Sequence, residues 1–61
     1  MTENEVTKVT GKKIKYHSLY YGRVYTGFVL GIEDGRVVIM TEGGKKNYRE
    51  LNEIIIDDVE K

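Results

Sequence analysis

The sequence predicts an all-β domain in which five short strands form a meander that closes on itself as a small barrel. Two observations predict this fold class. Runs rich in Val, Ile, Tyr and Phe recur about every ten residues and are separated by turn pairs such as Asp34-Gly35 and Gly43-Gly44. In addition, no stretch with helical periodicity is long enough to predict a substantial helix.

The first strand is predicted over residues 13–17, where polar and apolar side chains alternate. This alternation places Ile14 and Tyr16 on one face of the strand and Lys13 and Lys15 on the other. A loop rich in aromatic residues is expected to follow and to close at a glycine. The first strand therefore offers an apolar face for a core and a basic face for solvent.

The second and longest strand is predicted over residues 24–33, and it contains two glycines on the same face, Gly27 and Gly31. Glycine weakens a flat strand, because it has no side chain to pack and a large conformational freedom to lose. The pair therefore predicts either a strongly bent strand or the close approach of another backbone. Asp34-Gly35 then predicts a hairpin turn, because both central residues of the favoured two-residue turn need positive φ.

The remaining elements are shorter. They are a third strand over residues 36–41, a fourth over 46–48, one 3₁₀ turn over 49–52 and a fifth strand over 53–57. The third strand is apolar on both faces, which is typical of a central strand. Residues 1–10 are polar and without a period, so we expect a disordered or frayed N-terminal tail there, followed by the β domain over residues 11–61.

The length of 61 residues predicts one domain with a thin core, near the size below which chains usually need disulfides, metals or partners to fold. The absence of Cys excludes a disulfide framework and thiolate metal sites, and it is typical of a reducing compartment. No apolar run approaches the roughly 18–20 residues that a membrane span needs. We therefore expect a cytoplasmic protein without a metal or other cofactor.

Catalysis is not predicted, because the residue types for a reactive site are missing or misplaced. Nucleophilic catalysis needs a nucleophile, a base and an orienting group that converge. The single His17 and the single Ser18 are adjacent, so on a strand they point to opposite faces. The acidic pairs Glu33-Asp34 and Asp57-Asp58 also diverge and lie at turns or chain ends, where solvated acids are common.

Charge is distributed unevenly although the formal net charge is zero. Residues 1–30 contain five Lys or Arg and two acids, and residues 31–61 contain five Lys or Arg and eight acids, so the halves carry +3 and −3. No acidic residue lies between Lys8 and Ile32. The first half is a candidate surface for an anionic partner, although such an excess on a small β domain also arises by chance.

Candidate binding residues combine cations with tyrosines. They are Lys12, Lys13, Lys15, Tyr20, Tyr21, Arg23 and Tyr25, extended by Lys45, Lys46, Tyr48 and Arg49 if the second turn folds nearby. Cations neutralise phosphates, and rings stack on unpaired bases at roughly 1–3 kcal/mol per base. This combination favours a non-enzymatic nucleic-acid-binding module, whereas the neutral total and the pI near 6.6 are atypical of a dedicated one.

A protein-interaction module or small regulatory protein is the alternative of a different class. Exposed tyrosines are frequent interface anchors, and two oppositely charged halves suit a steered partner or self-association. Residues 54–56 are all isoleucine, so each face of the last strand carries at least one, and its edge could pair with a copy in a homodimer. An accessory protein of a phage or mobile element fits this size.

The order of these parts resembles the SH3-like barrels, and among them the Tudor domains most. The resemblance covers residues 11–57: a strand entered after Gly11, an aromatic loop closing at Gly22, a long bent strand, an acidic-glycine hairpin, two further strands, one 3₁₀ turn and a last strand. It implies an aromatic cage for methylated lysine or arginine, or a platform for nucleic acid. Tyr20, Tyr21 and Tyr25 stand at matching positions, with Tyr48 nearby, and no acidic residue is identified to complete the cage.

The Sm-like fold is a weaker rival within the same architecture. Its first motif is similar to the spacing of Gly22, Gly27, Val29 and Glu33 in this chain. The second half departs from that family, because no Met-Asn pair follows the acid and the later arginine-glycine signature is missing. The Tudor-like resemblance therefore remains the preferred one.

Overall fold

A computed structural model describes residues 1–60, and it contains one five-stranded antiparallel sheet. The strands are β1 (Lys13–Ser18), β2 (Tyr21–Glu33), β3 (Arg36–Thr41), β4 (Lys46–Glu50) and β5 (Ile54–Val59). A helix, α1 (Glu3–Val9), precedes them, and a 3₁₀ turn, η1 (Leu51–Glu53), separates β4 from β5. The all-β class, the five strands and the 3₁₀ turn before the last strand are confirmed. Lys61, the last residue of the predicted domain, lies outside the described residues.

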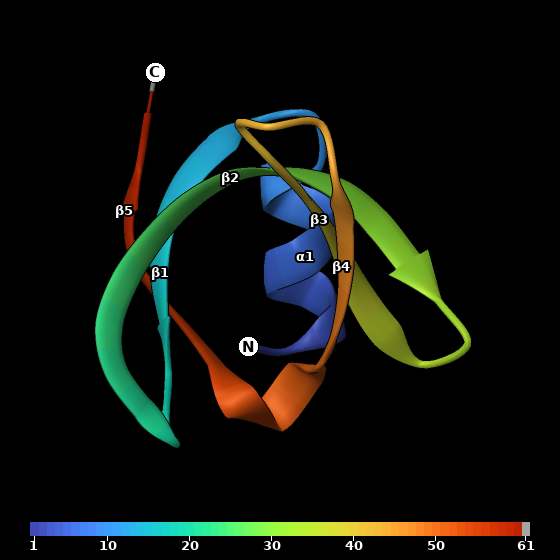
Figure 1. Ribbon diagram of the computed structural model, residues 1–61. Helices are drawn as coiled ribbons and strands as arrows, with labels where there is room; N and C mark the ends of the chain where they lie inside the picture. Colours follow the sequence, from blue (N-terminus) through green and yellow to red (C-terminus); the bar gives the residue numbers. More distant parts are fainter. Residues whose placement is uncertain (61) are drawn as a thin grey trace.

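The prediction of a closed barrel is wrong. The strand order is β4-β3-β2-β1-β5, so β4 and β5 are the two outer strands, and within residues 1–60 no pairing joins them. Figure 1 shows the sheet curving around α1, with β5 and β4 on opposite sides. The physical reason is that α1 occupies part of the interior that the strands of a closed barrel would fill with their own side chains.

The bend of β2 depends on its two glycines. A Cβ at Gly27 would lie 2.6 Å from Cγ2 of Ile39 and 2.9 Å from the carbonyl oxygen of Met40, so only glycine lets β3 approach this closely. Gly31 has a φ of 143° and lies where the β2–β3 register shifts. Both features expected from the glycine pair, a bend and a close approach, are therefore present. At the end of β2, Asp34 and Gly35 have positive φ values of 52° and 74°, as the predicted hairpin requires.

The N-terminal segment differs from the prediction of a frayed tail over residues 1–10, because residues 3–9 form α1. The Thr2 hydroxyl accepts a hydrogen bond from the Glu5 N–H at 3.2 Å, and the Glu5 carboxylate accepts one from the Thr2 N–H at 2.9 Å. This capping box satisfies N–H groups that would otherwise be unpaired at the helix start. Val6 and Val9, at i and i+3, are buried against the sheet, which supplies the stability that so short a helix lacks alone.

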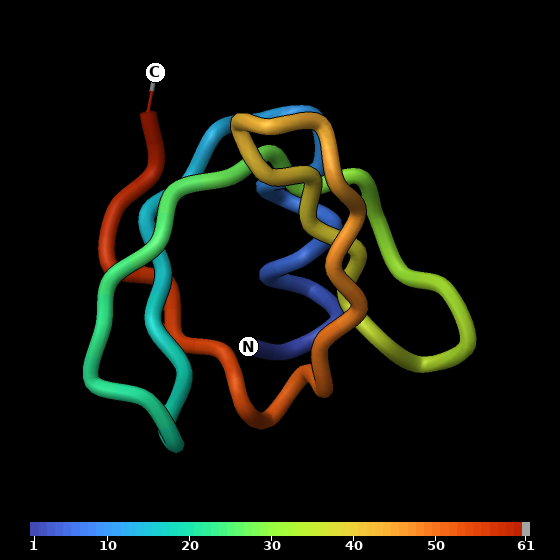
Figure 2. The backbone as a smooth tube through the Cα atoms, viewed as in Figure 1, coloured from blue at the N-terminus to red at the C-terminus, as the bar shows by residue number. Residues whose placement is uncertain are grey.

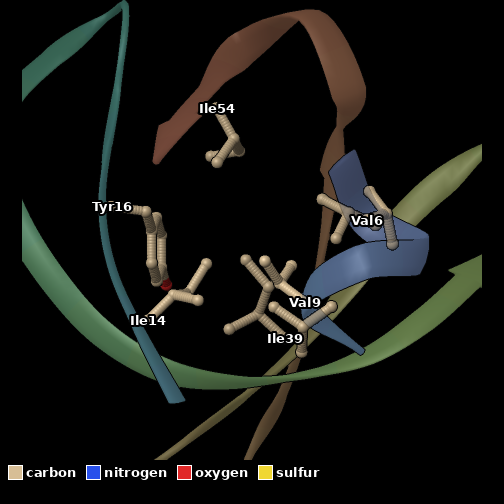
Figure 3. Close-up of a cluster of buried hydrophobic side chains, with 8 residues drawn as sticks. Val6, Val9, Ile14, Tyr16, Ile39 and Ile54 are labelled. Carbon is tan, nitrogen blue, oxygen red and sulfur yellow. The ribbon is translucent and has the colours of Figure 1, made fainter. Parts of the chain in front are cut away.

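The core lies between α1 and the inner face of the sheet. It consists of Val6, Val9, Ile14, Tyr16, Val29, Val37, Ile39 and Ile54. Figure 3 shows Val9 of α1 beside Ile39 and across the interior from Ile14 and Tyr16. The predicted inward face of β1 is thus confirmed.

The turns lie on different sides of the molecule. Figure 2 shows the β1–β2 turn in teal and the β2–β3 turn in yellow-green at opposite sides of the view. The first turn is tighter than the loop predicted after His17, because β1 continues to Ser18 and β2 begins at Tyr21. The aromatic residues of this segment are therefore held on strands or next to them.

Candidate ligand-binding cavity

A cavity of about 340 Å³ opens on the inner face of the sheet. It is lined by Tyr16, Ser18, Tyr21, Tyr25, Thr26, Thr41, Asn47, Arg49 and Ile54. No residue of α1 contributes to this lining, whereas Tyr16 and Ile54 also belong to the core. The cavity is therefore the part of the inner face that the helix leaves uncovered, and its volume is at the lower end of the roughly 300–1,000 Å³ typical of ligand pockets.

The register of β1 and β2 explains the stacked tyrosines. Tyr16 is paired with Tyr25, and cross-strand partners share a face, so both rings point inward. Their centroids are 5.9 Å apart and their planes are tilted by 31°. Only 4% of Tyr16 is exposed, compared with 42% of Tyr25. Tyr16 therefore forms the floor of the cavity, and Tyr25 presents a ring to solvent.

Two polar residues of β4 form the opposite wall. Asn47 and Arg49 pair with Ile39 and Val37, which are core residues, so their side chains belong to the inner face. Burial raises the pKa of the Tyr16 phenol, and the nearby Arg49 guanidinium and Asn47 amide act in the opposite direction. Within residues 1–60, Arg49 has no ion-pair partner. The cavity therefore contains a neutral phenol on its floor and an unneutralised cation on its wall.

Hydrogen bonds fix the turn that carries Tyr20 and Tyr21. The Ser18 hydroxyl donates to the Glu53 carboxylate at 2.9 Å and accepts from the Tyr20 N–H at 3.1 Å. The Leu19 N–H donates to the Glu53 carbonyl oxygen at 2.8 Å. The β1–β2 turn is thereby attached to η1, and Ser18 has no hydroxyl proton left for a ligand.

The structure brings together three of the eleven predicted site residues: Tyr21, Tyr25 and Arg49 line one cavity. Lys13 and Lys15 share the outer face of β1, as predicted, and Lys13 Nζ lies 3.2 Å from Glu42 Oε1, so the β3–β4 turn does fold near β1. The other predicted residues lie outside the cavity lining: Lys12, Tyr20, Arg23, Lys45, Lys46 and Tyr48. Of these, Tyr48 pairs with Val38, and Lys46 pairs with Met40, on the outer face.

Five polar cavity residues are absent from the predicted site: Tyr16, Ser18, Thr26, Thr41 and Asn47. The sequence predicts Tyr16 as a core residue and offers Ser18 only as a nucleophile, and it predicts no binding role for the other three. The period of β4 gives a signal for Asn47, because it lies two residues before Arg49 and so shares its face. The sequence contains no comparable signal that the inner face stays open at Tyr16.

His17 and Ser18 contact different carboxylates, those of Asp57 and Glu53. His17 Nδ1 lies 2.8 Å from Asp57 Oδ2, whereas Ser18 points to the interior, so the two adjacent residues face opposite sides as predicted. Within residues 1–60, no three His, Asp or Glu side chains are grouped in a way that could hold a metal ion. No helix in the described range has the length and apolar character needed to cross a membrane.

Comparison of the chain with protein-family models, with curated proteins and with solved structures gave no match.

Proposed function

We propose that the protein is a non-enzymatic module that binds single-stranded nucleic acid on the surface around the tyrosine cavity. The observation that supports this proposal best is that Tyr21 and Tyr25 of β2 and Arg49 of β4 line one cavity. Exposed rings stack with unpaired bases, and a guanidinium forms charge-assisted hydrogen bonds with phosphate oxygens. Arg23, which lies on β2 between the two tyrosines in sequence, is exposed and adds a second positive charge to that of Arg49 on β4.

The charge of the cavity favours an anionic ligand over a methylated cation. The Tudor-like assignment stays a prediction, and it would imply a cage for methylated lysine or arginine. A cage of that kind attracts cations through the ring faces. Here Arg49 stands on the cavity wall and no Asp or Glu is among the lining residues, so a cationic ligand would be repelled.

The proposal is tested by titrating labelled single-stranded oligonucleotides at low salt and at raised salt. Affinity should fall as salt rises, because phosphate contacts release counterions. Arg49→Gln should weaken binding, whereas Arg36→Gln should not, because Arg36 lies on β3 in an exposed ion pair with Glu50 at 3.1 Å. Absence of binding at low salt, with the protein folded, would reject the proposal.

Self-association is a second candidate, favoured by the open sheet. β4 and β5 each have one edge without a strand partner within residues 1–60. β5 carries Asp57 and Asp58, and β4 carries Lys46 and Arg49, so the edge of β5 suits the β4 edge of a copy better than another β5. Light scattering at low salt over a range of concentrations tests this, and a constant monomer mass would exclude it.

A further inference from the structure

The cavity can hold one flat group, but its closed floor prevents a nucleic-acid strand from passing through it. Its floor is closed, because Tyr16 and Ile54 are 4% and 1% exposed. Tyr21 and Tyr25 at its mouth are 59% and 42% exposed, so their rings are accessible to a ligand entering from outside. A nucleic-acid strand can therefore run across the mouth and insert a single residue.

We propose that the cavity is a subsite for one unpaired nucleobase, which stacks on Tyr25 and hydrogen-bonds through its edge to Asn47, while Arg49 contacts the adjoining phosphate. This inference rests on the proposed nucleic-acid-binding function and adds the ligand class and the contacts of this site. It also predicts that duplex nucleic acid is rejected, because paired bases offer neither a free ring face nor a free Watson–Crick edge.

The polar groups of the wall fit a base edge. The Asn47 amide has donors and an acceptor side by side, which is the arrangement that pairs with the adjacent acceptor and donor of a base. The Thr41 hydroxyl accepts from the Lys45 N–H at 3.2 Å and keeps its own proton to donate. Both side chains line the cavity, on β3 and β4.

The electrostatics of the site fit the phosphate. Arg49 is exposed and has no ion-pair partner among residues 1–60, so its guanidinium is available at the edge of the cavity. The Tyr16 phenol on the floor is uncharged at neutral pH, and burial raises its pKa further. The Glu53 carboxylate next to the cavity accepts a hydrogen bond from the hydroxyl of the lining residue Ser18 at 2.9 Å and is not itself part of the lining. Among the lining residues Arg49 is the one formal charge.

The test compares a short single-stranded oligonucleotide with the same strand in which every base is removed. Calorimetry or fluorescence anisotropy should show that the abasic strand binds about fivefold to a hundredfold more weakly, because stacking is lost. Asn47→Leu should lower the affinity for the base-bearing strand and leave the affinity for the abasic strand unchanged. Asn52→Leu is the matched control, because Asn52 is an exposed amide of η1 outside the cavity, and it should change neither affinity.

The outcomes separate this inference from the proposed function. Equal affinity of the two strands would overturn the base subsite and leave nucleic-acid binding intact, whereas no binding of either strand would reject the proposed function itself. Binding of a trimethyllysine or dimethylarginine peptide in preference to the base-bearing strand would also overturn the inference. If Asn47→Leu fails to fold, the wild-type protein is titrated with a nucleoside monophosphate instead. The side-chain amide of Asn47 should then change its chemical shift. No change at saturation would contradict the inference.

Discussion

The inner face of the sheet has two halves that differ in what covers them. The half near α1 is excluded from solvent, because Val6 and Val9 complete a buried apolar cluster with Ile14, Val29 and Ile39. The other half begins at Tyr16 and Ile54 and continues into polar side chains around an open cavity. A five-stranded sheet of this size thus uses one part of its concave surface for the core and leaves another part open as a cavity.

The difference follows from which residue types face inward along each strand. On β1 the inward positions change from Ile14 to Tyr16 to Ser18, and on β4 they are Asn47 and Arg49. Apolar side chains gain free energy by removing surface from water, whereas a guanidinium or amide loses solvation unless it is paired. A second helix over the cavity would therefore bury Arg49 without a counter-charge, and the open half is the stable arrangement for these residues.

The largest expected effect is in the covered half. Ile39→Ala removes a fully buried side chain from the core, and the free energy of unfolding should fall by about 2–5 kcal/mol. Urea denaturation followed by circular dichroism measures this change. Ile55→Ala is the matched control, because Ile55 is 39% exposed on the outer face, and it should cost less than about 1 kcal/mol. Equal losses would show that the core is not where we place it.

The contact between β2 and β3 should be nearly as sensitive. Gly27→Ala places a methyl group 2.6 Å from Ile39 Cγ2 and 2.9 Å from a backbone oxygen, so the two strands must move apart at a cost of about 1–3 kcal/mol. Gly43→Ala is the control, since its Cβ would have its nearest contact at 3.8 Å and its φ is not positive. The melting temperature of Gly27→Ala should lie clearly below that of Gly43→Ala, and similar melting temperatures would contradict the close contact between β2 and β3.

In the open half, substitution should affect binding more than stability. Tyr25→Leu removes a ring that is 42% exposed, and we expect a loss of about 1–3 kcal/mol in oligonucleotide binding. Phe28→Leu is closely matched, because Phe28 is 43% exposed but pairs with Lys13 and Met40 on the outer face. Its oligonucleotide affinity should equal that of the wild type. If both substitutions lowered the oligonucleotide affinity equally, the binding surface would not be the cavity.

Features of the fold that depend on neighbouring residues could be predicted from the sequence alone. Alternation correctly assigned Ile14 and Tyr16 to the interior, and Asp34-Gly35 correctly placed a hairpin, because these signals depend on neighbouring residues only. The helix was missed, since only Val6 and Val9 mark its buried side and its stability comes from tertiary contacts.

Closure of the sheet and the cavity could not be predicted from local patterns. Whether β4 meets β5 depends on what fills the interior, and α1 fills part of it with Val6 and Val9 from a segment that is otherwise polar in sequence. Tyr21, Tyr25 and Arg49 were identified as candidates by residue type, but their convergence depends on the curvature of the sheet. The face on which a side chain lies depends on its neighbours in sequence and is therefore predictable. Which residues of distant strands come together depends on the whole fold and is not.

The smallest expected effect concerns the cap of α1 and depends on pH. The hydrogen bond from the Thr2 N–H lowers the pKa of the Glu5 carboxyl below its ordinary value of 4.5. A carboxyl whose pKa is lowered by folding stabilises the folded state above the unfolded pKa, and this contribution is lost as the pH falls through the lower, folded value. Amide hydrogen exchange in α1 should therefore become faster, relative to β3, as the pH is reduced below about 4.5. Glu5→Gln should remove this pH dependence while keeping an acceptor for the Thr2 N–H. If the wild type and this variant respond identically to acid, Glu5 does not control the end of the helix that covers the core.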